Sequence, residues 1–209
     1  MRRAALIAVM AITAGVAGPA RGATATACTP PPGFQETEPP AIAPVDQLVS
    51  HTEEVVIDRP LDVVQKEADQ TGLSEGIRKA DALPGVSGTY PLTPNFGQPG
   101  SRRLVCLTDG STALEQIIQK DRDGTSARFS YVVWGYTSEK ARPVQYAVGS
   151  FVRTDLGDGR TRVRWTYSFQ LNRQRFPGYL GPIGDCMFRI GFLNRDYAQM
   201  MRRTLDGKK

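Results

Sequence analysis

Apolar and polar residues alternate most regularly over residues 161–171. The apolar positions of this run are Val163, Trp165, Tyr167, Phe169 and Leu171, and the positions between them are polar or charged. A period of two is typical of a β-strand, because successive side chains point to opposite faces of a sheet. The run therefore predicts a strand with one buried face and one solvated face.

Five earlier segments show weaker alternation of the same kind. They span residues 86–92, 103–107, 113–120, 127–136 and 144–154. Several of the short segments between them carry turn residues, namely Asp109-Gly110, Asp123-Gly124 and Gly157-Asp158-Gly159. Such turns supply the positive φ angles of tight hairpins, and the connections are too short for parallel crossovers. We therefore expect an antiparallel meander of six strands.

A strand and two short helices are predicted ahead of the meander. Residues 53–57 are rich in β-branched side chains and end at Asp58-Arg59-Pro60, a sequence typical of a helix N-terminus. Leu61, Val64 and Ala68 follow at helical spacing, so a first helix should end by Gly72. Residues 73–82 predict a second short helix.

The C-terminal segment has a helical period instead. Its apolar residues recur at spacings of four, three, four and four, at Cys186, Ile190, Leu193, Tyr197 and Met201. This pattern predicts a long amphipathic helix. Since no other predicted helix is of similar length, its apolar face should pack across the concave side of the sheet.

The N-terminus has the pattern of a secretory signal peptide. Arg2 and Arg3 precede a mostly apolar run over residues 4–18, which is too short to cross a membrane as a permanent helix. A small-x-small site predicts cleavage after Gly22, so residues 1–22 would be removed. The alternative is a lipoprotein junction that extends the leader to residue 27 and acylates Cys28. Both alternatives predict export to the periplasm or cell envelope.

Residues 23–50 are rich in proline, which favours extended chain over packing. We interpret them as a linker that tethers a domain at residues 51–206. The chain of 209 residues has a formal charge of +5, but the leader contributes three arginines and no acid. The remaining 23 basic and 21 acidic residues give +2, which does not indicate a nucleic-acid partner.

Three cysteines leave one unpaired in an oxidising compartment. If Cys28 is acylated, Cys106 and Cys186 are free to form a disulfide; the alternative is that both are buried thiols. The single histidine, His51, and the absence of a Cys-x-x-Cys motif argue against a metal site. Gly178, Gly181 and Gly184 do not follow a predicted strand, so a dinucleotide site is not expected, and we predict no cofactor.

The order of these elements resembles the START-like (SRPBCC) superfamily, and within it the polyketide cyclase/dehydrase-like and lipid-transport-like group. The resemblance covers residues 51–206. The residues that carry it are Val55-Val56-Ile57-Asp58-Arg59-Pro60, Leu83-Pro84-Gly85-Val86, Pro99-Gly100-Ser101-Arg102-Arg103-Leu104-Val105, Asp109-Gly110 with Glu115, Phe129-Ser130-Tyr131, and Thr161-Arg162-Val163-Arg164-Trp165. Many members have an aromatic residue near the position of Val64. The resemblance implies an α+β helix-grip fold, in which a curved antiparallel sheet wraps around the C-terminal helix and encloses a cavity.

Aromatic residues concentrate between positions 129 and 179, where they either line such a cavity or fill a solid core. With the resemblance, a pocket is the favoured interpretation. The candidate ligand-binding residues are Trp134, Tyr136, Phe151, Trp165, Tyr167, Phe169, Ile190, Leu193 and Tyr197. A catalytic alternative would use Glu115 as acid or base, with the hydroxyl of Tyr131 or Tyr167 orienting a carbonyl group.

Three functions follow from these alternatives. The leading hypothesis is a non-catalytic, exported protein that binds a hydrophobic or amphipathic small molecule, such as a lipid or an isoprenoid-like compound. The second is an enzyme of cyclase or dehydratase type, and the third is a cell-envelope interaction module with a vestigial pocket. Arg153, Arg160, Arg162 and Arg164 form a basic strand face that is either a solvated surface or a contact for anionic lipid headgroups.

Overall fold

The structure is a computed structural model that describes residues 28–73, 77 and 83–207. Within these residues seven strands form one sheet in the order β1-β7-β6-β5-β4-β3-β2. Every neighbouring pair is antiparallel. The strands are β1 (Val49–Ile57), β2 (Val86–Pro91), β3 (Arg102–Leu107), β4 (Thr112–Arg122), β5 (Ser126–Trp134), β6 (Val144–Asp155) and β7 (Thr161–Leu171).

The predicted turns connect these strands. Gly110, Gly157 and Gly159 all have φ near +80°, the left-handed conformation that a side chain disfavours. In the turn between β4 and β5, the Asp123 carboxylate accepts hydrogen bonds from the backbone N–H groups of Thr125 and Ser126. Two features of the sequence, glycines and a short acidic side chain, therefore close the hairpins locally.

Helix α1 (Leu61–Gln70) follows β1 directly, as predicted. It buries Leu61 and Val64 against the sheet. Most of the predicted second helix, at residues 73–82, lies outside the described residues. The signal peptide, at residues 1–22 or 1–27, lies outside them as well. No helix in the described part of the chain is long and apolar enough to cross a membrane.

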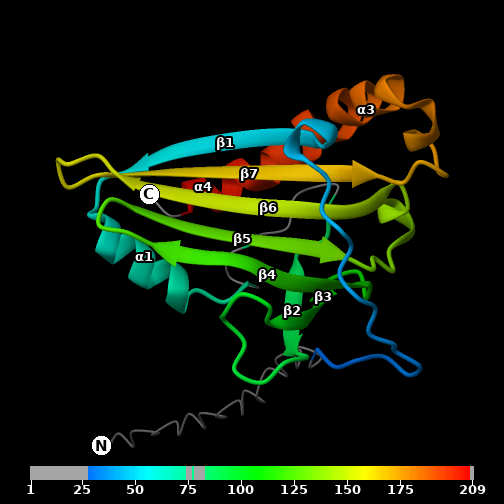
Figure 1. The fold of residues 1–209 in the computed structure, drawn as a ribbon, viewed down its shortest axis with the longest axis horizontal. Helices are drawn as coiled ribbons and strands as arrows, with labels where there is room; N and C mark the ends of the chain where they lie inside the picture. The colour runs from blue at the N-terminus through cyan, green and yellow to red at the C-terminus, as the bar shows by residue number, and fades with distance from the viewer. Residues whose placement is uncertain (1–27, 74–76, 78–82, 208–209) are drawn as a thin grey trace, which may run out of the picture.

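The C-terminal helix runs behind the sheet in Figure 1. It comprises α3 (Pro182–Phe188), a π-helical segment η4 (Arg189–Tyr197) and α4 (Ala198–Asp206), with short 3-10 turns elsewhere at Val45–Gln47, Glu139–Ala141 and Gly178–Leu180. Leu193, Met201 and Leu205 from this helix are buried against the concave face of the sheet. The α+β helix-grip fold is therefore confirmed.

The predicted apolar face of this helix is wrong in its first half. Ile190 is 68% exposed and Cys186 is also exposed, whereas Phe188 is buried and Phe192 packs against the core. The predicted spacing holds for a regular α-helix, in which each backbone N–H bonds to the fourth residue before it. In a π-helix the bond goes to the fifth residue before it, so the period of the buried face is different. Segment η4 therefore rotates the preceding turn relative to Leu193 and Tyr197.

The proline-rich segment is not a tether, which corrects the linker interpretation. Residues 28–48, here called the strap, cross the face of the sheet opposite to the C-terminal helix (Figure 1). Phe34, Ala43 and Leu48 join an apolar cluster with Leu104, Leu114, Val132, Trp134 and Tyr146. The Trp134 indole donates to Thr37 Oγ1 at 3.1 Å, and the Ala43 N–H donates to the Tyr146 hydroxyl at 2.8 Å. Extended chain packs here because the outer face of the sheet is itself apolar.

Candidate ligand-binding cavity

The concave face of the sheet positions the candidate site through aligned rows of side chains. One row aligns Tyr131, Gly149 and Tyr167 across β5, β6 and β7, and the next aligns Phe129, Phe151 and Trp165. Tyr131 can lie across β6 only because residue 149 is glycine: a Cβ there would stand 2.2 Å from the Tyr131 ring. The sheet therefore presents aromatic rings toward the C-terminal helix with a gap beside them.

That gap is an inner hollow of about 140 Å³ between the sheet and the helix. Its wall is mostly apolar and aromatic, and the helix contributes Phe192, Tyr197 and Met200. The sheet contributes Val105, Ala113, Glu115, Tyr131, Val133, Val144, Trp165 and Tyr167, and the connecting segments contribute Leu73, Ile77, Leu83 and Tyr136 among others. Apolar walls with a few polar groups are typical of small-molecule sites.

One polar residue of this wall, Glu115, belongs to a buried ion pair. Glu115 on β4 is 2% exposed and forms an ion pair with Arg103, which lies directly opposite it on β3. The Arg103 guanidinium also lies 4.5 Å above the centre of the Phe96 ring. Burial raises the pKa of Glu115, and Arg103 opposes that rise. A carboxyl group whose pKa is raised by burial holds its proton more tightly than an exposed one, which is a property of catalytic acids.

Two further polar atoms in the wall lack a well-aligned hydrogen bond within the described residues. The Tyr136 hydroxyl and the Trp165 indole N–H are both buried, and their nearest polar neighbours are the hydroxyls of Tyr167 and Tyr131, respectively. An unmade buried hydrogen bond costs about 1–3 kcal/mol. These atoms can therefore bond to a ligand or a water molecule in the hollow.

The tyrosines around the hollow remain protonated at neutral pH. Burial raises the pKa of Tyr131, Tyr136, Tyr167 and Tyr197 above the ordinary value. Nearby Glu115 raises the pKa of Tyr131 further. Each hydroxyl is consequently a hydrogen-bond donor and not a base.

An outer hollow of about 630 Å³ adjoins the inner one. The two share Leu73, Ile77, Glu115 and Tyr131 as wall residues. The outer hollow extends beneath α1, where Gln65, Asp69, Phe129, Phe151 and Arg153 face it. The inner hollow alone matches a small ring, since a cavity of about 150 Å³ binds benzene. The two together reach the ~300–1,000 Å³ of typical ligand sites.

The structure separates eight of the nine predicted ligand-binding residues into four groups. Tyr136, Trp165, Tyr167 and Tyr197 line the inner hollow, and Phe151 lines the outer one. Phe169 and Leu193 are completely buried in the core and line neither hollow. Ile190 faces solvent. All three catalytic candidates, Glu115, Tyr131 and Tyr167, line the inner hollow.

Trp134 is wrong as a cavity residue, because it lies on the outer face under the strap. The prediction placed Trp134 and Tyr136 on one face by strand alternation. Gly135 between them has a φ of +63°, which interrupts the strand, and Tyr136 turns into the cavity while Trp134 does not.

Sequence reasoning missed Arg103, Phe192 and Met200. Arg103 could have been found by pairing the strands at 103–107 and 113–120 through the Asp109-Gly110 turn, which places it opposite Glu115. Phe192 and Met200 carried no such signal, because the π-helical segment alters which residues of the helix face inward.

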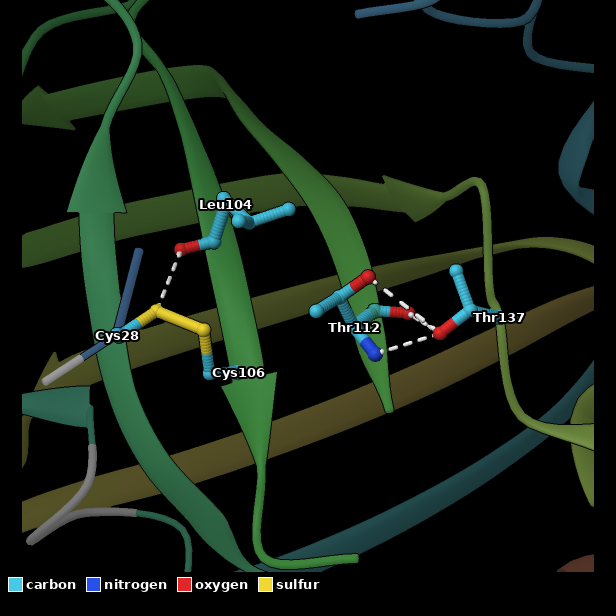
Figure 2. The surroundings of a disulfide bond; sticks show 5 residues. All are labelled: Cys28, Leu104, Cys106, Thr112 and Thr137. Carbon is cyan, nitrogen blue, oxygen red and sulfur yellow. Dashed lines mark hydrogen bonds between the residues drawn. A yellow bond between two sulfur atoms is a disulfide. The ribbon is translucent and has the colours of Figure 1, made fainter. Parts of the chain in front are cut away.

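The disulfide prediction is corrected by the bond in Figure 2, which joins Cys28 to Cys106 and not Cys106 to Cys186. Cys28 approaches β3 across the outer face of β2, where Gly88 leaves room: a Cβ at residue 88 would stand 2.9 Å from Cys28 Cβ. Cys186 is an exposed free thiol. Because its sulfur is in this bond, Cys28 cannot also carry the thioether of a lipoprotein.

The predicted basic strand face is largely neutralised. Arg162 and Arg164 both pair with Glu54, and Arg160 pairs with Asp158. Arg153 does not belong to this face, since it points into the outer hollow. His51 bonds to Asn194 and Glu53, and no group of three metal-ligating side chains occurs in the described ranges.

Comparisons with known proteins support the architecture. No protein-family model and no curated protein matches the chain. Solved structures do match: a START superfamily protein from Mycobacterium smegmatis (9% identity), the Zhui aromatase/cyclase from Streptomyces sp. R1128 (16%) and Ara h 8.0201 (18%). Each has a TM-score of 0.50 and aligns over 76% of this chain; the alignments cover 95%, 92% and 95% of those chains.

At these identities the likeness concerns the fold and not the activity. The matched proteins share the curved sheet and long C-terminal helix that the residue pattern predicted. The chain therefore has the START-like helix-grip fold, as its resemblance to the SRPBCC superfamily implied.

Proposed function

We propose that this protein binds a hydrophobic or amphipathic small molecule between the sheet and the C-terminal helix. The observation that carries the proposal is a hollow with aromatic walls, in which the buried Tyr136 hydroxyl and Trp165 indole N–H lack well-aligned hydrogen bonds. A ligand with an apolar body would remove the apolar surface of the walls from water, which stabilises the complex by about 25 cal/mol per Å² of buried surface. An oxygen atom on the ligand would accept hydrogen bonds from the Tyr136 hydroxyl and the Trp165 N–H.

We further propose that the protein is exported. The pattern at residues 1–22 favours this location. The Cys28–Cys106 bond supports it, because disulfides persist in oxidising compartments and are rare in the cytosol. The ligand would then be a compound of the cell envelope or surroundings, and we propose lipid or isoprenoid-like chemistry.

Native mass spectrometry of protein exported by a bacterial host tests the binding proposal. We expect a reproducible adduct that is lost on denaturation and that organic extraction recovers as a hydrophobic compound. Denaturing mass gives the processed N-terminus and the cysteine state of the same sample. Absence of any adduct, together with failure to take up added amphiphiles, would contradict the proposal.

A second candidate function is catalysis of cyclase or dehydratase type. It is favoured by the position of Glu115 in the wall beside Tyr131, with a pKa raised by burial. The Zhui aromatase/cyclase, named for such activity, shares the fold. Incubating the extracted compound with fresh protein distinguishes the two: an enzyme converts it to a product, and Glu115→Gln abolishes the conversion. An unchanged compound leaves binding as the function.

The third candidate, an interaction module with a vestigial pocket, has less support. A vestigial pocket would be filled by side chains, whereas the two adjoining hollows here are large enough for a ligand.

A further inference from the structure

Arg153 is a buried cation inside the outer hollow. It lies on β6, is 5% exposed, and contributes to the wall beneath α1. Its strand neighbours in the same row are Ala127 on β5 and Val163 on β7, neither of which carries a charge. An arginine in such a position is uncommon, since charged side chains are rarely buried unless they are paired.

The described residues supply Arg153 with weak partners and no ion pair. Its guanidinium donates to Gln65 Oε1 at 3.4 Å and lies 5.4 Å from the centre of the Phe151 ring. The nearby carboxylate of Asp69 stabilises the positive charge of Arg153 from a distance. That carboxylate forms its ion pair with Lys120, at 3.3 Å. An arginine stays protonated at neutral pH and has five N–H donors, of which the described residues engage only the one that bonds to Gln65.

The charges around it favour an anion. Arg103, Lys120, Arg122 and Arg128 also line the outer hollow, against the three acids Asp69, Glu115 and Asp121. Arg103 and Lys120 are engaged by Glu115 and Asp69. A cleft lined with an excess of one charge raises the local concentration of the opposite ion.

We propose that Arg153 binds the carboxylate or phosphate group of an amphipathic ligand whose apolar body extends into the inner hollow. This inference rests on the proposed binding function and names its ligand class, an anionic amphiphile. Gly149 on β6 is level with Tyr131 and Tyr167, and Arg153 lies four residues further along the same strand. At about 3.3 Å per residue, the headgroup and the apolar end of the ligand would be about 13 Å apart. A guanidinium can meet either anion with two parallel hydrogen bonds.

The test compares three alkyl probes of equal chain length: dodecanoate, dodecyl phosphate and dodecanol. Binding to delipidated protein is measured by calorimetry at pH 7 for the wild type, Arg153→Met and Arg153→Lys. Arg164→Gln is the matched control, because it removes an arginine of the same sheet that faces away from the cavity. We expect the wild type to bind at least one anion about tenfold or more tightly than dodecanol.

That preference should disappear in Arg153→Met, persist in part in Arg153→Lys and remain intact in Arg164→Gln. The tighter of the two anions then identifies the headgroup. Equal binding of the anions and dodecanol to the wild type would overturn the inference and leave the proposed function standing. Failure of all three probes to bind would contradict the proposed function itself.

Thermal unfolding of the ligand-free variants separates binding from a structural role. A buried charge without a partner destabilises the fold, so Arg153→Met should unfold at the same temperature as the wild type or higher. A large fall in its midpoint would show that Arg153 holds the fold together, and would overturn the assignment. An anion preference kept in Arg153→Met would overturn it as well.

Discussion

At the scale of single residues, the cavity is distinguished by polar groups that are buried in a mostly apolar wall. Glu115 is the clearest case, because it is almost fully buried and forms an ion pair with Arg103. Arg103 in turn packs on Phe96. The position of this pair in the wall makes it the natural contact for a polar substituent of a ligand.

The raised pKa of Glu115 predicts a dependence of stability on pH. Since the folded protein holds this proton more tightly than the unfolded chain, the resulting stabilisation is full below the ordinary pKa of 4.5. It is lost as the pH rises through the folded pKa. The free energy of unfolding in guanidinium, measured for the wild type and Glu115→Gln, should therefore shift in favour of the wild type as the pH falls towards 4.5. A difference that is constant with pH would contradict this.

Trp165 has two roles that different substitutions can separate. It is completely buried and stacks on Phe151 at 4.7 Å, so Trp165→Ala should cost about 3–5 kcal/mol of stability. Trp165→Phe keeps most of the packing and removes the indole N–H, which has no well-aligned hydrogen bond within the described residues. We expect it to weaken the binding of the extracted ligand by about fivefold to tenfold, as calorimetry would measure.

Trp134→Phe is the matched control for that experiment. It removes an indole N–H that bonds to Thr37 under the strap, on the face of the sheet away from the cavity. Ligand affinity should be unchanged in this variant. Equal weakening in both variants would mean that the indole of Trp165 does not act through the cavity.

At the scale of elements, the strap and the C-terminal helix cover opposite faces of one sheet. The strap is attached at its start by Cys28–Cys106, and Arg102 pairs with Glu36 and Glu38 within it. The helix, in turn, is joined to β1 by the ion pair of Arg202 with Glu53 at 2.7 Å. Both faces of the sheet are therefore covered: the strap packs on strands β3 to β6, which lie far from it in sequence, and the helix is joined to β1 near the start of the sheet.

The disulfide should contribute strongly to stability, because it closes a long loop with a sequence separation of 78. Cys28→Ser is expected to lower the free energy of unfolding by about 4 kcal/mol in guanidinium titration. Cys186→Ser should leave it unchanged, since that thiol is exposed and free. Similar losses in both variants, or three free thiols in the oxidised wild type, would disagree with this pairing.

At the scale of the whole molecule, the hollow core implies that ligand and stability are linked. A ligand that binds only the folded state at about 100 times its Kd contributes about 2.7 kcal/mol. For a domain of this size the thermal midpoint should rise by about 5–10 °C when the extracted compound is added to delipidated protein. Trp134→Phe should respond equally. No rise at saturation would mean that the compound does not bind the folded cavity.

The elements of the fold were predictable from the sequence, because each depends on local properties. Alternation over residues 161–171, glycines in the turns and the Asp58–Pro60 junction are all readable within a few positions. They correctly predicted β7, the hairpins and α1. The order of these elements was enough to identify the helix-grip fold, since few topologies accommodate a meander followed by one long helix.

Much of the site depended on contacts between distant segments. The strap packs because the outer face of the sheet offers Trp134 and Tyr146, and Cys28 bonds to Cys106 because that packing brings them together. Gly135 interrupts the alternation of β5, and the π-helical segment interrupts the helical period of the C-terminal helix. As a result, Trp134 and Ile190 face away from the cavity. The burial of Glu115 and Arg153 follows from the curvature of the sheet and from the segments packed over its concave face. The period of apolar residues predicts which side chains share one face of a helix or strand. Whether that face is buried, and which residues it pairs with, depends on the segments that pack against it.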